Sequence, residues 1–200
     1  MRLLIATKNA HKTGEIRSIL GTEWTVEDLT KHLEIDSPEE TGDSFEANAI
    51  IKAVAASRMF AGYVLADDSG LEVDALEGAP GVFSARYAGP GANDAENRAL
   101  LLKNLTTFPS PARFRCVMCI AAHGRSLATF SGSVEGAIVG SERGVGGFGY
   151  DSLFVPAGES LTFAELPAST KNSFSHRAKA LGQAREFLIK IVDAQPADPT

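Results

Sequence analysis

Two adjacent aspartates at the end of an apolar segment constrain this chain most. Residues 64–66 are apolar, Asp67 and Asp68 follow, and Gly70 precedes a second, alternating apolar stretch. The pattern predicts a buried strand that ends in an acidic turn, followed by a second strand. The carboxylates would then lie at the carboxyl end of a strand, the edge where open α/β sheets bind ligands. Because neighbouring strand residues point to opposite faces, only one aspartate is expected to face a given site.

Carboxylate oxygens at such an edge suit Mg²⁺, which binds through one or two carboxylates together with substrate phosphates. The same residues are also common in solvated turns, where Ser69 and Gly70 would be the turn formers. The stretch alone leaves both interpretations open.

Length and composition favour one folded domain without a membrane segment. The chain has 200 residues, 44% of them hydrophobic, which suits one domain with a single core and leaves room for a small lobe. No apolar run approaches the roughly 20 residues that span a bilayer. The apolar start is too soon interrupted by Lys8 for a signal peptide, so a cytoplasmic protein is expected. The net charge of −6 argues against a broad nucleic-acid-binding surface.

Cys116 and Cys119 have the CxxC spacing of redox and zinc sites. They lie in an apolar run that reads as a strand, where residues three apart point to opposite faces. Two buried core thiols are therefore expected, with a metal or redox role as the less favoured alternative.

The rest of the chain alternates between strand and helix patterns, which predicts an α/β fold. Strands are expected at 2–7, 24–29, 114–122 and 127–139, the last two joined by a hairpin turn at 123–125 and able to form a lobe beyond the first sheet. Four helices are expected: from after residue 12 to Gly21, from Asp43 to about residue 60, over 93–105, and from about 171 onward. Asp43 would cap the second of these helices and form a capping box with Glu46. Ala95, Ala99 and Leu102 would form the inner face of the third. Residues 193–200 read as a disordered tail.

Basic residues gather at the starts of two predicted helices, where the helix dipole disfavours them. Lys8, His11 and Lys12 precede the first helix, and a second group containing Arg177 opens the last. A bound anion such as a phosphate chain would explain both groups. The alternative is that these long side chains simply point into water.

Lys52 lies among small and apolar residues, one helical turn after Asn48. A lysine in that setting would be partly buried and need an anionic partner. The alternative is a surface lysine whose stem alone is buried.

The glycine-rich segment 144–149 matches G-x-G-x-x-G, but an extended segment closed by a proline follows it instead of a helix. This context argues against a dinucleotide site. The loop would instead present Phe148, Tyr150 and Asp151, aromatic rings that stack on bases and a carboxylate that accepts a base N–H. Two core aromatics beside a turn are the alternative.

Six segments, in order over nearly the whole chain, resemble the inosine triphosphate pyrophosphatase (Ham1-like) family. They are 7–12 with Glu15, 39–52, 66–76, 78–87, 146–151 and 175–177. At Lys8 many members have glycine or serine. The resemblance implies one elongated α/β domain over residues 1–192, with a mixed central sheet flanked by helices and two lobes around a cleft. It also implies a homodimer that uses Mg²⁺.

The resemblance assigns site roles that agree with the patterns above. Asp68 would be the catalytic base and a metal ligand, Glu39 a second metal ligand, and Lys12 and Lys52 would neutralise charge during the reaction. Triphosphate contacts fall on Thr7, Lys8, Asn9, Ala10, His11, Lys12, Lys52 and Ser69. The base pocket falls on Phe148, Gly149, Tyr150, Asp151, Lys171, His176 and Arg177.

The implied activity is hydrolysis of non-canonical purine triphosphates (ITP, dITP, XTP and dXTP) to the monophosphate and pyrophosphate, which cleanses the nucleotide pool. A phosphatase that releases single phosphates and a non-catalytic nucleotide sensor are the alternatives, and the extra carboxylates argue against a sensor. Arg177, a protonated His176 and backbone N–H groups near Phe148 would donate to the purine O6. Adenine would leave such donors unpaired.

Overall fold

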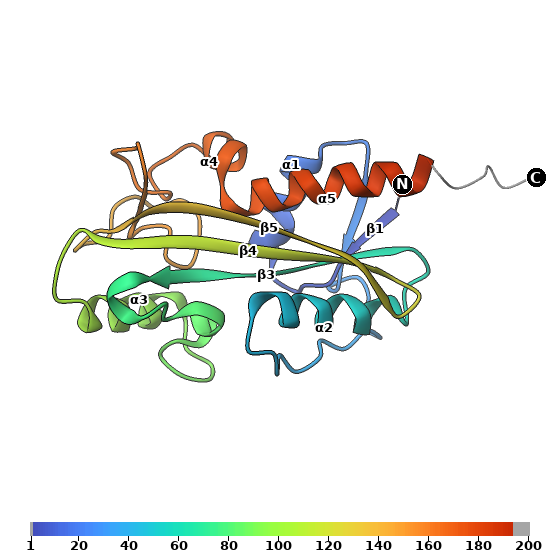
Figure 1. Cartoon of the computed structure of the whole chain (residues 1–200), viewed down its shortest axis with the longest axis horizontal. Coiled ribbons are helices and arrows are strands. Elements are labelled where there is room, and N and C mark those ends of the chain that lie inside the picture. Colours follow the sequence, from blue (N-terminus) through green and yellow to red (C-terminus); the bar gives the residue numbers. More distant parts are fainter. Residues whose placement is uncertain (1, 194–200) are drawn as a thin grey trace, which may run out of the picture.

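One six-stranded mixed sheet runs through the computed structural model, which describes residues 2–193 (Figure 1). Two neighbouring pairs are parallel, β2–β1 and β1–β3, and the remaining pairs are antiparallel. The spatial order is β2 (Thr25–Asp28), β1 (Arg2–Ile5), β3 (Tyr63–Val73), β4 (Ser110–Ala122), β5 (Arg125–Ile138) and β6 (Phe154–Pro156). The predicted α/β class with a mixed sheet is confirmed.

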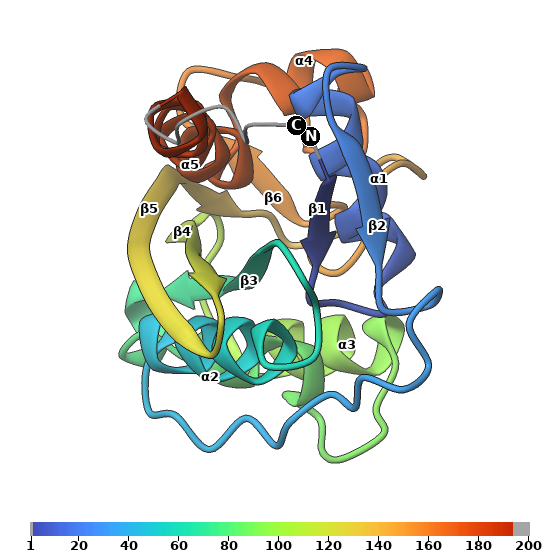
Figure 2. The ribbon, with the colours of Figure 1, turned by 90° about the vertical axis from the view of Figure 1, so that its right-hand side faces the viewer.

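Helices cover both faces of this sheet (Figures 1 and 2). One face carries α1 (Ala10–Leu20), α4 (Ala168–Phe174) and α5 (His176–Asp193). The other carries α2 (Phe45–Ser57) and α3 (Asp94–Asn104), with the short 3₁₀ helices η1 (Asp74–Leu76) and η2 (Gly81–Arg86). None of the helices within 2–193 is long and apolar enough to cross a membrane.

Alternation along β3 and β4 divides the core into clusters on the two faces of the sheet. Val64 and Cys119 pack under α2, whereas Leu65 and Cys116 pack against α1 and α5. Both thiols are free and buried, on opposite faces, as the strand pattern predicted. A third cluster around Phe114 fills the far end of the sheet, under α3.

The expected acidic turn at Gly70 is wrong, because β3 continues unbroken through it. Every residue from Val64 to Val73 pairs with β4, so the backbone stays extended past both aspartates. Gly70 serves a close approach: a Cβ there would lie 2.4 Å from Ser84 Oγ and 2.5 Å from the Gly81 carbonyl oxygen. The glycine therefore lets η2 lie against the strand.

The predicted hairpin between β4 and β5 is confirmed, with positive φ angles at His123 and Gly124. The expectation that these strands form a lobe beyond the first sheet is wrong. β4 pairs with β3 over ten residue pairs, so the hairpin extends the same sheet.

Helix boundaries and faces differ from the sequence patterns in four places. The first helix begins at Ala10, because Asn9 caps it. Ser44 rather than Asp43 caps α2, and Glu46 accepts a hydrogen bond from Thr129 instead of closing a capping box. The predicted last helix is two, α4 and α5, separated at Ser175.

The fourth difference concerns the inner face of α3. Ala95 and Ala99 are exposed and Leu102 is only half-buried, whereas Asn97 and Leu101 are buried. Asn97 binds backbone groups of the preceding loop, which makes a polar residue the inward one. At the other end of the chain, α5 includes Asp193, and residues 194–200 of the predicted tail lie outside the described residues.

Candidate functional site

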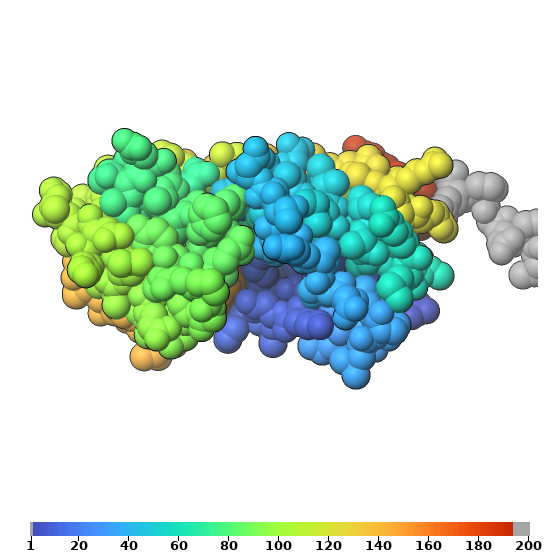
Figure 3. All heavy atoms as spheres, turned by 90° about the horizontal axis from the view of Figure 1, so that it is seen from below, coloured from blue at the N-terminus to red at the C-terminus, as the bar shows by residue number. Residues whose placement is uncertain are grey.

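A cleft of about 290 Å³ opens beside β3, where β1 stops. β1 pairs with β3 only as far as Ile5 and Leu65, so the edge of β3 beyond that point is free of this neighbour. Seen from below, a hollow separates the green surface over η2 and α3 from the blue surface over α2 (Figure 3). The structure therefore has an open cleft at the two aspartates, although it lies along the side of a strand and not at its end.

Most of the predicted site residues line this one cleft, although they come from distant parts of the chain. They are Thr7, Lys8, Asn9, Lys12, Lys52, Asp68, Ser69, Phe148, Gly149, Tyr150, Asp151, Lys171, His176 and Arg177. Three predicted residues do not line it: Ala10, His11 and Glu39.

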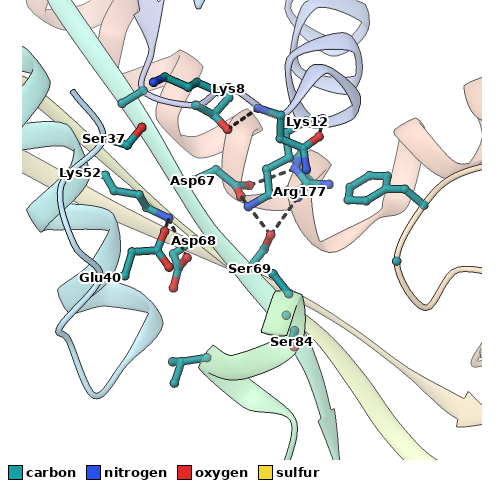
Figure 4. Close-up of a pocket in the computed structure, with 18 of the residues that line it drawn as sticks. Lys8, Lys12, Ser37, Glu40, Lys52, Asp67, Asp68, Ser69, Ser84 and Arg177 are labelled. Atoms are coloured by element: carbon teal, nitrogen blue, oxygen red, sulfur yellow. Dashed lines mark hydrogen bonds and ion pairs between the residues drawn. The ribbon is translucent and has the colours of Figure 1, made fainter. Parts of the chain in front are cut away.

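Both Asp67 and Asp68 line the cleft, contrary to the expectation that only one would. Their side chains do point to opposite faces of β3, toward α5 and α2 respectively (Figure 4). The cleft surrounds the free edge of the strand and reaches both faces. The two carboxylates consequently have different partners.

The Asp67 carboxylate accepts hydrogen bonds at both of its oxygens. It accepts from Lys12, from Arg177 Nε at 2.9 Å, from Ser69 Oγ at 3.0 Å and from Cys116 Sγ at 3.0 Å. Burial alone would raise its pKa, but the charges of Arg177 and Lys12 outweigh burial and hold the pKa well below 3.8. With both oxygens engaged, Asp67 is suited to organising the cations around it.

Asp68 keeps one oxygen free. Its Oδ1 accepts from Lys52 Nζ at 2.7 Å, while its buried Oδ2 has no partner among the described residues. Burial raises the pKa of this carboxyl above 3.8 despite the lysine. Lys52 also binds Glu40 at 3.0 Å, which confirms the prediction of a buried lysine with an anionic partner.

The carboxylates near Asp68 fit a cation that takes few protein ligands. Asp68 Oδ2 offers an unpartnered oxygen, and Glu40 lines the cleft beside it. Glu39, the residue predicted from the sequence, is exposed and outside the cleft lining. Residues 2–193 contain no cluster of three or more metal-ligating side chains. This donor set suits Mg²⁺, which completes its shell with water and substrate phosphates.

The loop before α1 brings polar groups to the other lip of the cleft. Asn9 caps the helix by accepting from the backbone N–H groups of His11 at 2.9 Å and Lys12 at 3.2 Å, so these two groups are already occupied. His11 stacks on Phe148, with ring centroids 5.2 Å apart. Lys8 is exposed and, alone among the lysines and arginines of the cleft within 2–193, has no carboxylate partner.

The glycine loop and the α4–α5 junction form the remaining wall. Asp151 pairs with Lys171 at 2.5 Å, and burial raises the pKa of its carboxyl despite this lysine. The Tyr150 hydroxyl donates to the Ser84 carbonyl at 2.9 Å, which fixes the loop against η2. The Phe148 ring lies 5.2 Å from Lys171 Nζ and 5.7 Å from the Arg177 guanidinium carbon.

The expectation of a protonated His176 is wrong. Burial, together with the charges of Arg177 and Lys171, lowers the pKa of this imidazole well below 6.5, so the ring is neutral. It stacks on Phe114 at 4.8 Å, and its Nδ1 has no partner among the described residues. Arg177 is also engaged by the protein itself, through Asp67, Glu15 and Ser69.

Glu15, to which the sequence patterns gave no role, does not line the cleft but binds two residues that do. From α1 it accepts from Lys171 at 2.8 Å with one oxygen and from Arg177 with the other. The charges of Arg177 and Lys171 lower its pKa although burial opposes them. A signal did exist, because buried cations at the α4–α5 junction require buried carboxylates.

The fold and the cleft define an α/β protein whose site combines carboxylates, lysines and an aromatic loop. A model of the Ham1 family matches residues 3–187, and the chain belongs to this family. A relative from Geobacter sulfurreducens named dITP/XTP pyrophosphatase is 45% identical over 191 residues, which are 94% of this chain and 96% of the relative. One of the same name from Exiguobacterium sibiricum is 45% identical, over 96% of this chain and 99% of its own.

Solved structures agree in fold. A HAM1 protein from Coxiella burnetii superposes with a TM-score of 0.84 at 38% identity, covering 95% of this chain and 99% of its own. The Ham1 protein of Staphylococcus aureus gives 0.83 at 37% identity, covering 96% of this chain and all of its own.

Proposed function

We propose that this protein hydrolyses non-canonical purine nucleoside triphosphates (ITP, dITP, XTP and dXTP) to the monophosphate and pyrophosphate, and so removes deaminated purines from the nucleotide pool. One observation carries the proposal: a carboxylate with a free oxygen, Asp68, lies in a cleft between a basic loop and an aromatic loop. The names of the relatives above supply the substrate class.

The residues of the cleft divide into a reacting half and a recognising half. Asp68 has a raised pKa and an unpartnered oxygen, which suits it to accept a proton from the attacking water. Lys12 and Lys52 lie on either side of β3 and would neutralise the charge that develops on the phosphates. Phe148 would stack on the base, and Asp151 would accept a base N–H.

Mg²⁺ is part of this proposal. Asp68 and Glu40 would hold it, and Glu39, the ligand expected from the sequence, precedes Glu40 in the chain. The ion supplies charge neutralisation at phosphate oxygens and lowers the pKa of bound water. The proposal further includes a homodimer, as the family resemblance implies, and a cytoplasmic location.

Product analysis with ITP, XTP, GTP and ATP in Mg²⁺ tests the proposal. ITP and XTP should each give their monophosphate and pyrophosphate in equal amounts, with much slower turnover of ATP. Asp68→Asn, purified in parallel, controls for contaminating phosphatases. Accumulation of inosine diphosphate with orthophosphate would overturn the proposal in favour of a phosphatase. Light scattering after size-exclusion chromatography tests the dimer.

A further inference from the structure

The glycine loop that carries Phe148 is held by one helix, α3, whose Asp94 also lines the rim of the cleft. Asp94 Oδ2 accepts from the Gly149 backbone N–H at 2.7 Å, and Arg98 Nη1 donates to the Gly149 carbonyl at 2.9 Å. Both polar backbone groups of one residue are thus bound by side chains of α3. Asp94 and Arg98 are four residues apart, so they share one face of that helix.

Arg98 also ties the two ends of the loop together. Its Nε lies 2.9 Å from Glu142 Oε2, and the same Glu142 oxygen accepts from Ser152 Oγ at 3.0 Å. Glu142 precedes the glycines and Ser152 follows them. α3 therefore contacts the loop at Gly149 and, through Glu142, at its start.

A loop of this composition needs such contacts to hold one position. Gly144, Gly147 and Gly149 have positive φ angles, and glycine loses more conformational freedom on ordering than any other residue. The loop's position decides where Phe148 lies relative to Lys171 and Arg177. Hydrogen bonds from a capped helix offset part of that entropy cost.

The contacts also remove donors that a base would otherwise use. The Phe148 N–H donates to Asp151 Oδ2 at 2.9 Å, and the Gly149 N–H donates to Asp94. Neither N–H is free for a purine O6. Residues 148 and 149 therefore act on the base through the position of the Phe148 ring and not through their N–H groups.

We propose that Asp94 and Arg98 are specificity-determining residues, which hold Gly149 and thereby fix the aromatic platform that receives the base. The inference rests on the proposed function. The clamp is more than 50 residues away in sequence from the loop and acts on recognition, whereas Asp68 and Lys52 belong to a separate hydrogen-bonded group. Loss of the clamp should therefore impair base selection more than chemistry.

The test compares Asp94→Ala and Arg98→Ala with wild type in steady-state kinetics. For each variant we expect KM for ITP to rise and the ITP-over-ATP preference in kcat/KM to fall about tenfold, the value of one charge-assisted hydrogen bond, with kcat for ITP within about threefold. Asp94→Asn keeps an acceptor and should restore most of the preference.

Glu96→Ala is the matched control, because Glu96 caps the same helix through the Asn93 N–H without touching the loop. Hydrogen exchange in the free protein gives a readout apart from activity: amides of 147–151 should exchange faster in Asp94→Ala and not in Glu96→Ala. If wild type does not hydrolyse ITP, the proposed function is overturned. If it does, but Asp94→Ala keeps its preference or Glu96→Ala loses it equally, the clamp alone is overturned.

Discussion

Asp67 and Asp68 are adjacent in the chain, yet the fold gives their carboxylates opposite electrostatic surroundings. Asp67 has its pKa lowered by two cations that neutralise it, whereas burial raises the pKa of Asp68 and leaves one oxygen unpartnered. The first therefore stabilises the arrangement of Lys12 and Arg177, and the second is available to react.

The variants Asp68→Asn and Asp67→Asn should separate these roles. We expect Asp68→Asn to lose turnover by roughly a hundredfold or more, the contribution of a general base, with little change in thermal stability. Asp67→Asn leaves Lys12 without a carboxylate partner and Arg177 with Glu15 alone, and should cost about 3 kcal/mol of unfolding free energy. Kinetics and urea unfolding measure the two effects. Near-normal turnover of a folded Asp68→Asn variant would move the base to another carboxylate such as Glu40.

His176 should make the stability of the protein depend on pH. Its pKa in the folded state lies well below the ordinary 6.5, so below pH 6.5 the unfolded chain takes up a proton that the folded chain does not. Stability conferred by the neutral ring is thus complete above pH 6.5 and is lost as the pH falls.

His176→Phe keeps a ring against Phe114 but cannot titrate. When the pH is lowered from about 7.5 to about 5.5, wild type should lose about 1.4 kcal/mol of unfolding free energy relative to His176→Phe. This is the effect of one histidine that is protonated only in the unfolded chain, one pH unit below its unfolded pKa. Urea denaturation at the two pH values measures this difference. A constant difference would contradict a depressed pKa at this position.

Among the elements, the sequence predicted those whose signals are local. The β4–β5 hairpin, the α3 helix and the burial of Lys52 follow from periodicity and turn residues that lie next to one another. The continuity of β3 could not be predicted this way, because it depends on pairing with β4 some fifty residues later. Long-range pairing overrode the local turn signal of Gly70.

The site shows the same division. Side chains in the loops 7–9 and 148–151 follow from their composition, and the cleft contains them. Which of Glu39 and Glu40 pairs with Lys52 could not be predicted from the sequence, because it depends on how the loop before α2 folds back onto that helix. Glu15 belongs to the first segment of the family resemblance, but its role depends on its partners at the α4–α5 junction, which the sequence did not place beside it.

Gly132 allows α5 to lie directly on β5. A Cβ at this position would come within 2.3 Å of the His176 carbonyl oxygen and 2.7 Å of the Ala180 nitrogen. We expect Gly132→Ala to lower the unfolding free energy by about 1–3 kcal/mol, the range for overpacking. Gly182→Ala is the control: its Cβ meets nothing, and it should stabilise α5 by about 0.5–1 kcal/mol. Equal stability of the two variants would contradict the close approach.

At the scale of the whole molecule, almost all positive charge in the cleft is already neutralised by carboxylates of the protein. Apart from Lys8, every lysine and arginine of the cleft within the described chain is paired with a carboxylate, and the protein carries a net charge of −6. A polyphosphate entering this cleft would bring negative charge that the protein alone does not balance. A divalent cation bound with the substrate would balance it.

Removal of divalent cations should therefore stop turnover without unfolding the protein. With excess EDTA we expect the rate with ITP to fall by about a hundredfold or more, and Mg²⁺ to restore it. Circular dichroism should be unchanged by EDTA, because the described residues fold around ion pairs of their own. Full activity in EDTA would show that the ion is dispensable.

The three longest strands, β3, β4 and β5, pass without a break from one half of the molecule to the other (Figure 1). The two sides of the cleft are therefore joined by three continuous β-strands and not by flexible linkers. Continuous strands bend or twist by small amounts at many residues, so they resist a rigid rotation of one half of the molecule about a single hinge. We therefore expect closure around a ligand to proceed by flexing of these strands and by movement of the loops at the rim, without a domain rotation.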